Sequence, residues 1–156
     1  MDESLSEEYM RANIDTIDWY RISFYQSLSE DFIREFQDKV DWHRISISQK
    51  LSDDFIREFQ DKLDWRVICY DRILTEEFMI KFQDKLDWYN VSYRQKLSEE
   101  FMINYQDKLN WYNISGHQKL SGKFILRFID KLKIDKILLT QKLDPETKEY
   151  LKLLKG

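Results

Sequence analysis

The sequence predicts an all-α protein: an α-solenoid of six two-helix repeats of equal length, followed by a C-terminal capping helix. A leucine recurs at a constant step of twenty-three, as from Leu5 to Leu28, without insertion or deletion, and a tryptophan keeps the same step. Gly (3) and Pro (1) are scarce among 156 residues, which favours helices joined by short connections. The leucines are Leu5, Leu28, Leu51, Leu74, Leu97, Leu120 and Leu143, and the tryptophans are Trp19, Trp42, Trp65, Trp88 and Trp111.

The first helix of each repeat is predicted to start just after the residue that follows the leucine. That residue is a good N-cap in every copy, and acidic residues that complement the helix dipole follow it in most copies. Phe55, Ile56, Phe59 and Leu63 then fall on one face of such a helix. The predicted caps are Ser6, Ser29, Ser52, Thr75, Ser98 and Ser121, with Asp144 before Pro145 in a seventh half-copy.

The second helix of each repeat is predicted to span about two turns, because the next leucine follows only nine residues after the tryptophan. Its caps are Asp18, Asp41, Asp64, Asp87 and Asn110. In the second copy Trp42, Ile45 and Ser46 are expected to face inward. Counting the leucine as position 1, position 19 is small in the first five copies, which allows close helix approach, and Cys69 there is expected to be packed rather than reactive.

We expect one helical-repeat domain over residues 1–156. The repeats start at residues 5, 28, 51, 74, 97 and 120, and the cap covers 143–156. The sixth copy departs from the consensus, with Lys133-Ile134 where the others have a capping residue and Trp, and Gly122-Lys123 where most have an acidic pair. Terminal repeats often differ because they seal the array, so a helix from about Pro145 to Leu154 should cover this copy.

Three segments of the consensus carry a resemblance: D-W-x-x-I-S, Q-x-L-[ST] and E-x-F-I. Together they resemble short tandem repeats in uncharacterised proteins of giant DNA viruses and some phages, over about residues 5–142. The resemblance implies a viral or phage origin and a role against a host factor, and it supplies no catalytic residue.

The residue pattern argues against an enzyme, a bound metal and a cofactor. His43 and His117 occupy different repeat positions, no metal-binding or phosphate-binding motif is present, and the carboxylates recur as caps and solvated faces. The single Cys69 allows no internal disulfide. Without a membrane-length apolar run or a signal sequence, we expect an intracellular protein, in the host cytoplasm if viral, with no membrane partner.

The candidate binding surface lies on the second helices, at the positions that vary most between copies: 16, 17, 20 and 21. Positions 16 and 20 are often aromatic, and Tyr and Arg are enriched at binding hot spots. The predicted partner-binding residues are Tyr20, Phe24, Arg44, Ile47, Arg66, Tyr70, Tyr89, Tyr93, Arg94 and Tyr112. An equally weighted alternative is that these aromatics pack between neighbouring repeats and extend the core.

A second variable pair occupies positions 7 and 8 of the first helix. It changes from Arg34-Glu35 and Arg57-Glu58 to Ile80-Lys81 and Ile103-Asn104 along the chain. Ile80, Ile103 and Leu126 would form an exposed apolar patch, or be covered by curvature of the array.

The leading functional hypothesis is a protein–protein interaction scaffold that binds or inhibits a host protein. The alternative is a nucleic-acid-binding or nucleic-acid-mimicking repeat protein, although the sequence pI near 5.3 lacks the basic signature of the former. Residues 1–115 carry a net charge of −9 and residues 116–156 a net charge of +5. This asymmetry is compatible with an end-to-end homo-oligomer under either hypothesis, and the alternative interpretation is a lysine-rich terminal cap.

Overall fold

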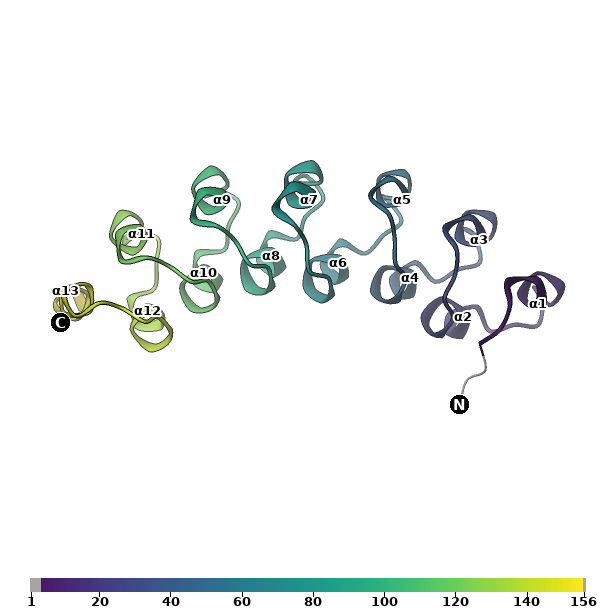
Figure 1. Ribbon diagram of the computed structural model, residues 1–156, viewed down its shortest axis with the longest axis horizontal. Coiled ribbons are helices and arrows are strands. Elements are labelled where there is room, and N and C mark those ends of the chain that lie inside the picture. Colours follow the sequence, from purple (N-terminus) through teal and green to yellow (C-terminus); the bar gives the residue numbers. More distant parts are fainter. Residues whose placement is uncertain (1–3, 156) are drawn as a thin grey trace. The chain divides into compact units, whose positions relative to one another are not determined.

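The computed structural model describes residues 4–155, and all regular secondary structure in that range is helical. Helices pack in regularly repeated pairs, which confirms the predicted all-α solenoid of two-helix repeats (Figure 1). The chain divides into two compact units: unit 1 ends at Arg72 and unit 2 begins at Ile73. The assignment of all 156 residues to one domain stays a prediction.

Each unit contains two layers, one made by the first helices of its repeats and one by the second helices (Figure 1). The helices of unit 1 are α1 (Glu7–Ala12), α2 (Trp19–Tyr25), α3 (Glu30–Glu35), α4 (Trp42–Ser48), α5 (Asp53–Glu58) and α6 (Trp65–Asp71). Those of unit 2 are α7 (Glu76–Lys81), α8 (Trp88–Arg94), α9 (Glu99–Asn104), α10 (Trp111–His117), α11 (Gly122–Arg127), α12 (Ile134–Thr140) and α13 (Pro145–Lys155).

The predicted N-caps of both helices are confirmed by their side-chain hydrogen bonds. Ser52 Oγ accepts the N–H of Phe55 at 3.1 Å, and every other predicted Ser, Thr, Asp or Asn cap accepts an N–H in the same way. Lys133 caps α12 without a side-chain bond, because an ammonium offers no acceptor. The second helices are seven residues long, as the spacing predicts.

The first helices end earlier than the run of apolar residues. In α5 the last helical residue is Glu58, and Phe59 is the C-cap. The Phe59 carbonyl then accepts the N–H groups of Lys62 at 2.9 Å and Leu63 at 3.2 Å, which closes a tight turn. Leu63 is buried as predicted, but from this turn rather than from a continuous helical face.

Within each unit, the repeated tryptophan joins one repeat to the following one. Trp42 stacks on Phe55 and Phe59 of the next repeat, with ring centroids 6.3 and 5.0 Å apart. Trp88 does the same with Phe101 and Tyr105 at 6.2 and 5.4 Å in unit 2. Each indole N–H also donates to a backbone carbonyl in the turn that precedes the tryptophan in its own repeat. The same side chain therefore packs on the next repeat and holds the turn of its own repeat.

Position 19 is buried in five copies, as predicted, and the structure adds a function that its small size did not reveal. Ser46 Oγ donates to the Trp42 carbonyl at 2.7 Å and accepts the backbone N–H of Asp64, in the next repeat, at 2.9 Å. The same pair of bonds is made by Ser23, Ser92 and Ser115. Position 19 is therefore a polar link as well as a close contact. Cys69 is fully buried, which confirms it as a packed residue.

A buried glutamine at position 22 forms a second link. Gln49 Oε1 accepts the N–H of Leu28 at 3.0 Å, while its Nε2 donates to the carbonyls of Ser23 and Gln26 at 3.0 and 2.8 Å. Gln118 repeats this arrangement in unit 2. Arg72 holds the position in the third copy and donates to the Ser46 and Gln49 carbonyls. Burial lowers the pKa of the Arg72 guanidinium.

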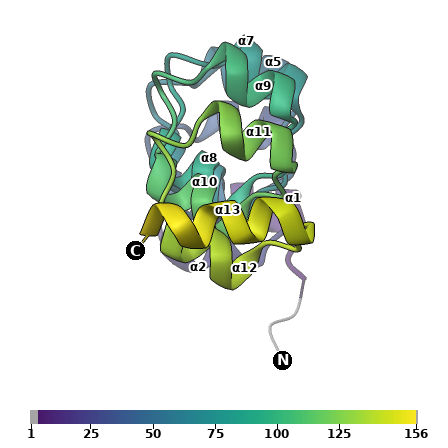
Figure 2. The ribbon, with the colours of Figure 1, turned by 90° about the vertical axis from the view of Figure 1, so that its left-hand side faces the viewer.

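α13 covers the last repeat, as the sequence predicts, and lies beside α12 (Figure 2). Gly122 makes this possible. A Cβ at this position would lie 2.8 Å from Thr147 Oγ1 and 3.2 Å from Asp144 Oδ2, so these two side chains would have to shift to admit any other residue. The loss of the acidic residue in the sixth copy is thus explained by the close approach of the capping segment.

Candidate protein-binding face

All ten predicted partner-binding residues lie on second helices. Unit 1 places Tyr20 and Phe24 on α2, Arg44 and Ile47 on α4, and Arg66 and Tyr70 on α6. Unit 2 places Tyr89, Tyr93 and Arg94 on α8 and Tyr112 on α10. We call positions 16 and 20 of these helices, with position 17 where it packs on them, the aromatic face of each unit.

Position 16 is exposed in each of these copies. Tyr20, Tyr89 and Tyr112 keep 50%, 58% and 55% of their surface accessible. Positions 18 and 19 of the same short helices turn inward and are buried, which leaves position 16 outside the core. Exposed tyrosines recurring at one position are therefore a surface feature, and the alternative that they extend the core is wrong for this position.

Position 20 behaves differently, because three of its side chains are half-buried. Phe24, Ile47 and Tyr93 are intermediate in exposure, whereas Tyr70 remains 43% exposed. Tyr93 packs edge-on against His117 of the next repeat, with ring centroids 4.3 Å apart. Tyr93 therefore packs between repeats, as the core-extension interpretation requires, and the half-burial of Phe24 and Ile47 agrees with it.

Cations at position 17 stack on the rings of the preceding repeat. The Arg44 guanidinium lies 4.3 Å from the Tyr20 ring centroid and 5.1 Å from that of Phe24. Lys136 Nζ lies 3.5 Å from the Tyr112 centroid. Gly116 leaves room for this lysine, since a Cβ there would lie 3.3 Å from the Lys136 stem. Such cation–π contacts hold the tyrosines in one orientation.

His43 replaces the aromatic residue at position 16 of the second copy and links it to the third. Its Nδ1 lies 3.0 Å from Asp64 Oδ2, the same carboxylate that caps α6. Burial acts to raise the pKa of Asp64. Hydrogen bonds from His43 and from the N–H groups of Val67 and Arg66 outweigh burial, so that the pKa lies below its ordinary value.

Three residues of this surface were missed by the sequence prediction. Lys136 shares position 17 with Arg44 and could have been found by aligning the sixth copy. Tyr25, at the variable position 21, is 59% exposed and packs edge-on against Phe24 at 4.8 Å. Leu139, at position 20 of the sixth copy, is also largely exposed.

The described residues contain no group of three or more His, Cys, Asp or Glu side chains arranged to hold a metal ion. Within the same range no helix combines the length and the apolar character needed to cross a bilayer. Comparisons with known protein families, with curated proteins and with solved structures found no match.

Proposed function

We propose that this protein is a scaffold that binds a partner protein through its aromatic face. The observation that carries the proposal is the exposed tyrosine at position 16 of three copies, Tyr20 in unit 1 and Tyr89 and Tyr112 in unit 2, on helices whose inner positions stay nearly constant. A partner that covers such rings gains apolar burial together with hydrogen bonds from their hydroxyl groups.

The way these rings are held favours binding further. Tyr20 is stacked beneath Arg44, and Tyr112 beneath Lys136, so that each ring loses little conformational freedom when a partner covers it. The resemblance of the repeat to those of giant DNA viruses and phages makes a host protein the partner to seek first.

The proposal is tested with the double variant Tyr89→Ala/Tyr112→Ala in unit 2. Capture of a specific protein from nuclease-treated host lysate should fall by about tenfold or more, as for hot-spot residues. Tyr9→Ala is the matched control, because Tyr9 is 52% exposed but lies on α1, in the other layer of unit 1. Equal capture by the parent and the double variant, both folded by circular dichroism, would contradict the proposal.

Nucleic-acid binding is the second candidate, since exposed aromatic rings beside cations suit single strands. Two of the lysines in the basic C-terminal region are engaged within the protein, however. Lys131 lies 3.6 Å from Asp107 and 5.4 Å from the Trp111 ring, and Lys136 is stacked on Tyr112. Fluorescence anisotropy with labelled single-stranded DNA and RNA tests this candidate, which requires binding that weakens steeply with salt.

Mimicry of nucleic acid is weakened by the same inter-repeat contacts. Three of the exposed aspartates at position 11, which would imitate phosphates, lie close to a lysine from the next repeat. Lys62 is 3.7 Å from Asp38 and Lys108 is 3.6 Å from Asp84. A row of carboxylates neutralised in this way is a poor imitation of a phosphate backbone.

A further inference from the structure

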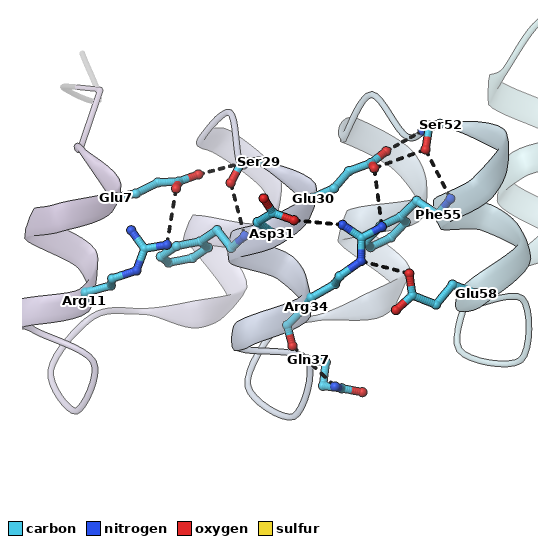
Figure 3. Close-up of polar contacts among 11 residues, drawn as sticks. Glu7, Arg11, Ser29, Glu30, Asp31, Arg34, Gln37, Ser52, Phe55 and Glu58 are labelled. Carbon is cyan, nitrogen blue, oxygen red and sulfur yellow. Dashed lines mark hydrogen bonds and ion pairs between the residues drawn. The ribbon is translucent and has the colours of Figure 1, made fainter.

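In unit 1 an arginine fills the space between successive first helices. Arg34 of α3 contacts Asp31 Oδ1 at 3.0 Å, Glu30 Oε2 at 3.7 Å and, on α5, Glu58 Oε2 at 2.8 Å (Figure 3). Its guanidinium also lies 5.0 Å from the Phe55 ring centroid. We call this space, formed by positions 3, 4 and 7 of one repeat and positions 4, 5 and 8 of the next, the slot.

The slot between α1 and α3 is filled in the same way. Arg11 contacts Glu7 at 3.5 Å and Glu35 of the next repeat at 2.8 Å, and its guanidinium lies 5.1 Å from the Phe32 ring. Two slots of unit 1 therefore hold a guanidinium with carboxylates around its edge and an aromatic ring beneath it. This is the geometry that a planar, forked cation favours.

The corresponding slot of unit 2, between α7 and α9, has the same frame without the arginine. Position 7 is Ile80, and position 8 of the next repeat is Asn104 instead of glutamate. A cavity of about 580 Å³ lies there, lined by residues that include Glu76, Glu77, Glu100 and Phe101. Among the described residues that line it, none is Lys or Arg.

Two of the parts that held the cation in unit 1, the glutamate at position 3 and the aromatic ring at position 5, are preserved around this cavity, whereas the glutamate at position 8 is not. Glu76 accepts the N–H and hydroxyl of Ser98 at 2.6 and 3.0 Å. Glu30 makes the same two contacts with Ser52 and still reaches Arg34 (Figure 3). The ring of Phe101 packs on Tyr105 at 4.6 Å, as Phe55 packs on Phe59.

We propose that the slot between α7 and α9 binds an arginine side chain supplied by a partner protein. The guanidinium would pair with Glu76 and Glu77, the residues equivalent to Glu30 and Asp31, beside Phe101, which lines the cavity and is itself buried. Ile80, 48% exposed at the rim, offers an apolar surface for the methylene stem of the arginine. This site is in the layer of first helices, so it does not depend on the aromatic face.

The neighbouring slot of unit 2 explains why the site is confined to one place. Between α9 and α11 the equivalent positions carry Lys123 and Arg127, and the Arg127 guanidinium lies 5.3 Å from the Phe128 ring. That slot supplies its own positive charges. Only the slot between α7 and α9, among those described within the two units, combines acidic residues with no internal cation.

The test uses acetyl-Gly-Arg-Gly-amide as the probe in a two-dimensional NMR titration of the full chain. Amides of residues 76–81 and 98–105 should shift, and the matching Lys peptide should bind about threefold or more weakly, because an ammonium cannot fork or stack. Glu77→Gln/Glu100→Gln should weaken arginine binding by about fivefold or more. Glu8→Gln/Asp15→Asn, with the same change of charge on unit 1, should leave it unchanged.

A second variant fills the slot from within. Ile80→Arg/Asn104→Glu reproduces the arrangement of Arg34 and Glu58, so it should fold and lose the peptide. Binding to this variant equal to that of the parent would overturn the proposal, as would an absence of shifts at residues 76–105. If the unit 1 control weakened arginine binding as much as Glu77→Gln/Glu100→Gln does, the proposal would also be overturned, because the effect would then come from overall charge alone. The result of this titration does not depend on whether the Tyr89→Ala/Tyr112→Ala variant loses the captured protein, so failure of this proposal can be told apart from failure of the proposed function.

Discussion

The first-helix layers of the two units share one backbone plan and differ in their outer residues. In unit 1, Arg at position 7 and Glu at position 8 tie α1 to α3 and α3 to α5. In unit 2, position 7 is Ile80, Ile103 and Leu126, and no such ladder can form. Ile80 and Leu126 are exposed and Ile103 is half-buried, so the predicted apolar patch is present in part.

Because the two units share a fold without sharing this ladder, the residues at positions 7 and 8 of the first helices contribute little to the stability of the fold. Exposed ion pairs contribute little to stability, because solvent screens them and holding long side chains costs entropy. The same tryptophan column, the same position 19 serines and the same glutamine links occur in both units. The outer residues are therefore free to change from contacts within the protein to contacts with a partner.

Replacing the repeated tryptophans, which lie in the interior that the two units share, should destabilise the protein most. Trp42→Ala and Trp88→Ala should each lower the free energy of unfolding by about 3 kcal/mol, because each leaves a cavity beside two rings of the next repeat. Urea titrations followed by circular dichroism would measure both. If the two units share the same interior, both variants should lose a similar amount of unfolding free energy. A loss below about 1 kcal/mol in either variant would mean that the column does not hold the repeats together.

A smaller effect is expected when the slot of unit 1 is converted to that of unit 2. Arg34→Ile/Glu58→Asn should lower the melting temperature less than either tryptophan variant and should create binding of acetyl-Gly-Arg-Gly-amide at residues 30–34 and 53–59. Arg57→Ile is the control, because Arg57 pairs with Asp54 of its own helix. If the converted slot stays inert to the peptide, the equivalence of the two slots is wrong.

The smallest effect concerns acid stability, to which each unit contributes one carboxylate. Hydrogen bonds from the Thr147 N–H and hydroxyl lower the pKa of Asp144, and hydrogen bonds lower that of Asp64 despite its partial burial. A lowered folded-state pKa stabilises the fold above the ordinary value of 3.8, and that stability is lost as pH falls through the folded value.

Asp64→Asn and Asp144→Asn should therefore destabilise the protein at neutral pH and flatten the loss of melting temperature between about pH 5 and pH 2. Thermal unfolding across that range checks both variants. Asp15→Asn, an exposed aspartate outside both contacts, serves as the control. A variant as acid-sensitive as the parent would show that its carboxylate does not contribute.

Sequence reasoning succeeded where the deciding chemistry is local. Ser52 and Asp64 could be recognised as caps because a capping bond spans two or three residues, and six copies repeat the signal. Pro145 after Asp144 located the last helix for the same reason. The short second helices followed from the fixed spacing between tryptophan and leucine.

The slot and the exposure of the aromatic face could not be predicted in this way. Arg34 meets Glu58 of the following repeat, and Arg44 meets Tyr20 of the preceding one. Neither pairing follows from the pattern within one repeat, because it depends on how successive helices pack. The polar function of Ser46 was missed for the same reason: its size was visible, whereas its partner, the Asp64 N–H, lies in the next copy.

The glutamine at position 22 has a consequence for how such a chain can change in length. Gln118 alone satisfies three backbone groups at its junction: the Leu97 N–H and the carbonyls of Ser92 and Gln95. Removal of residues 97–119 would bring Gln141 against the Gln95 carbonyl in its place. A junction held by such a glutamine thus completes itself, so a whole copy that carries the glutamine can be gained or lost without orphaning these backbone groups. An insertion or deletion of any other length would leave some of these backbone groups without their hydrogen-bond partner.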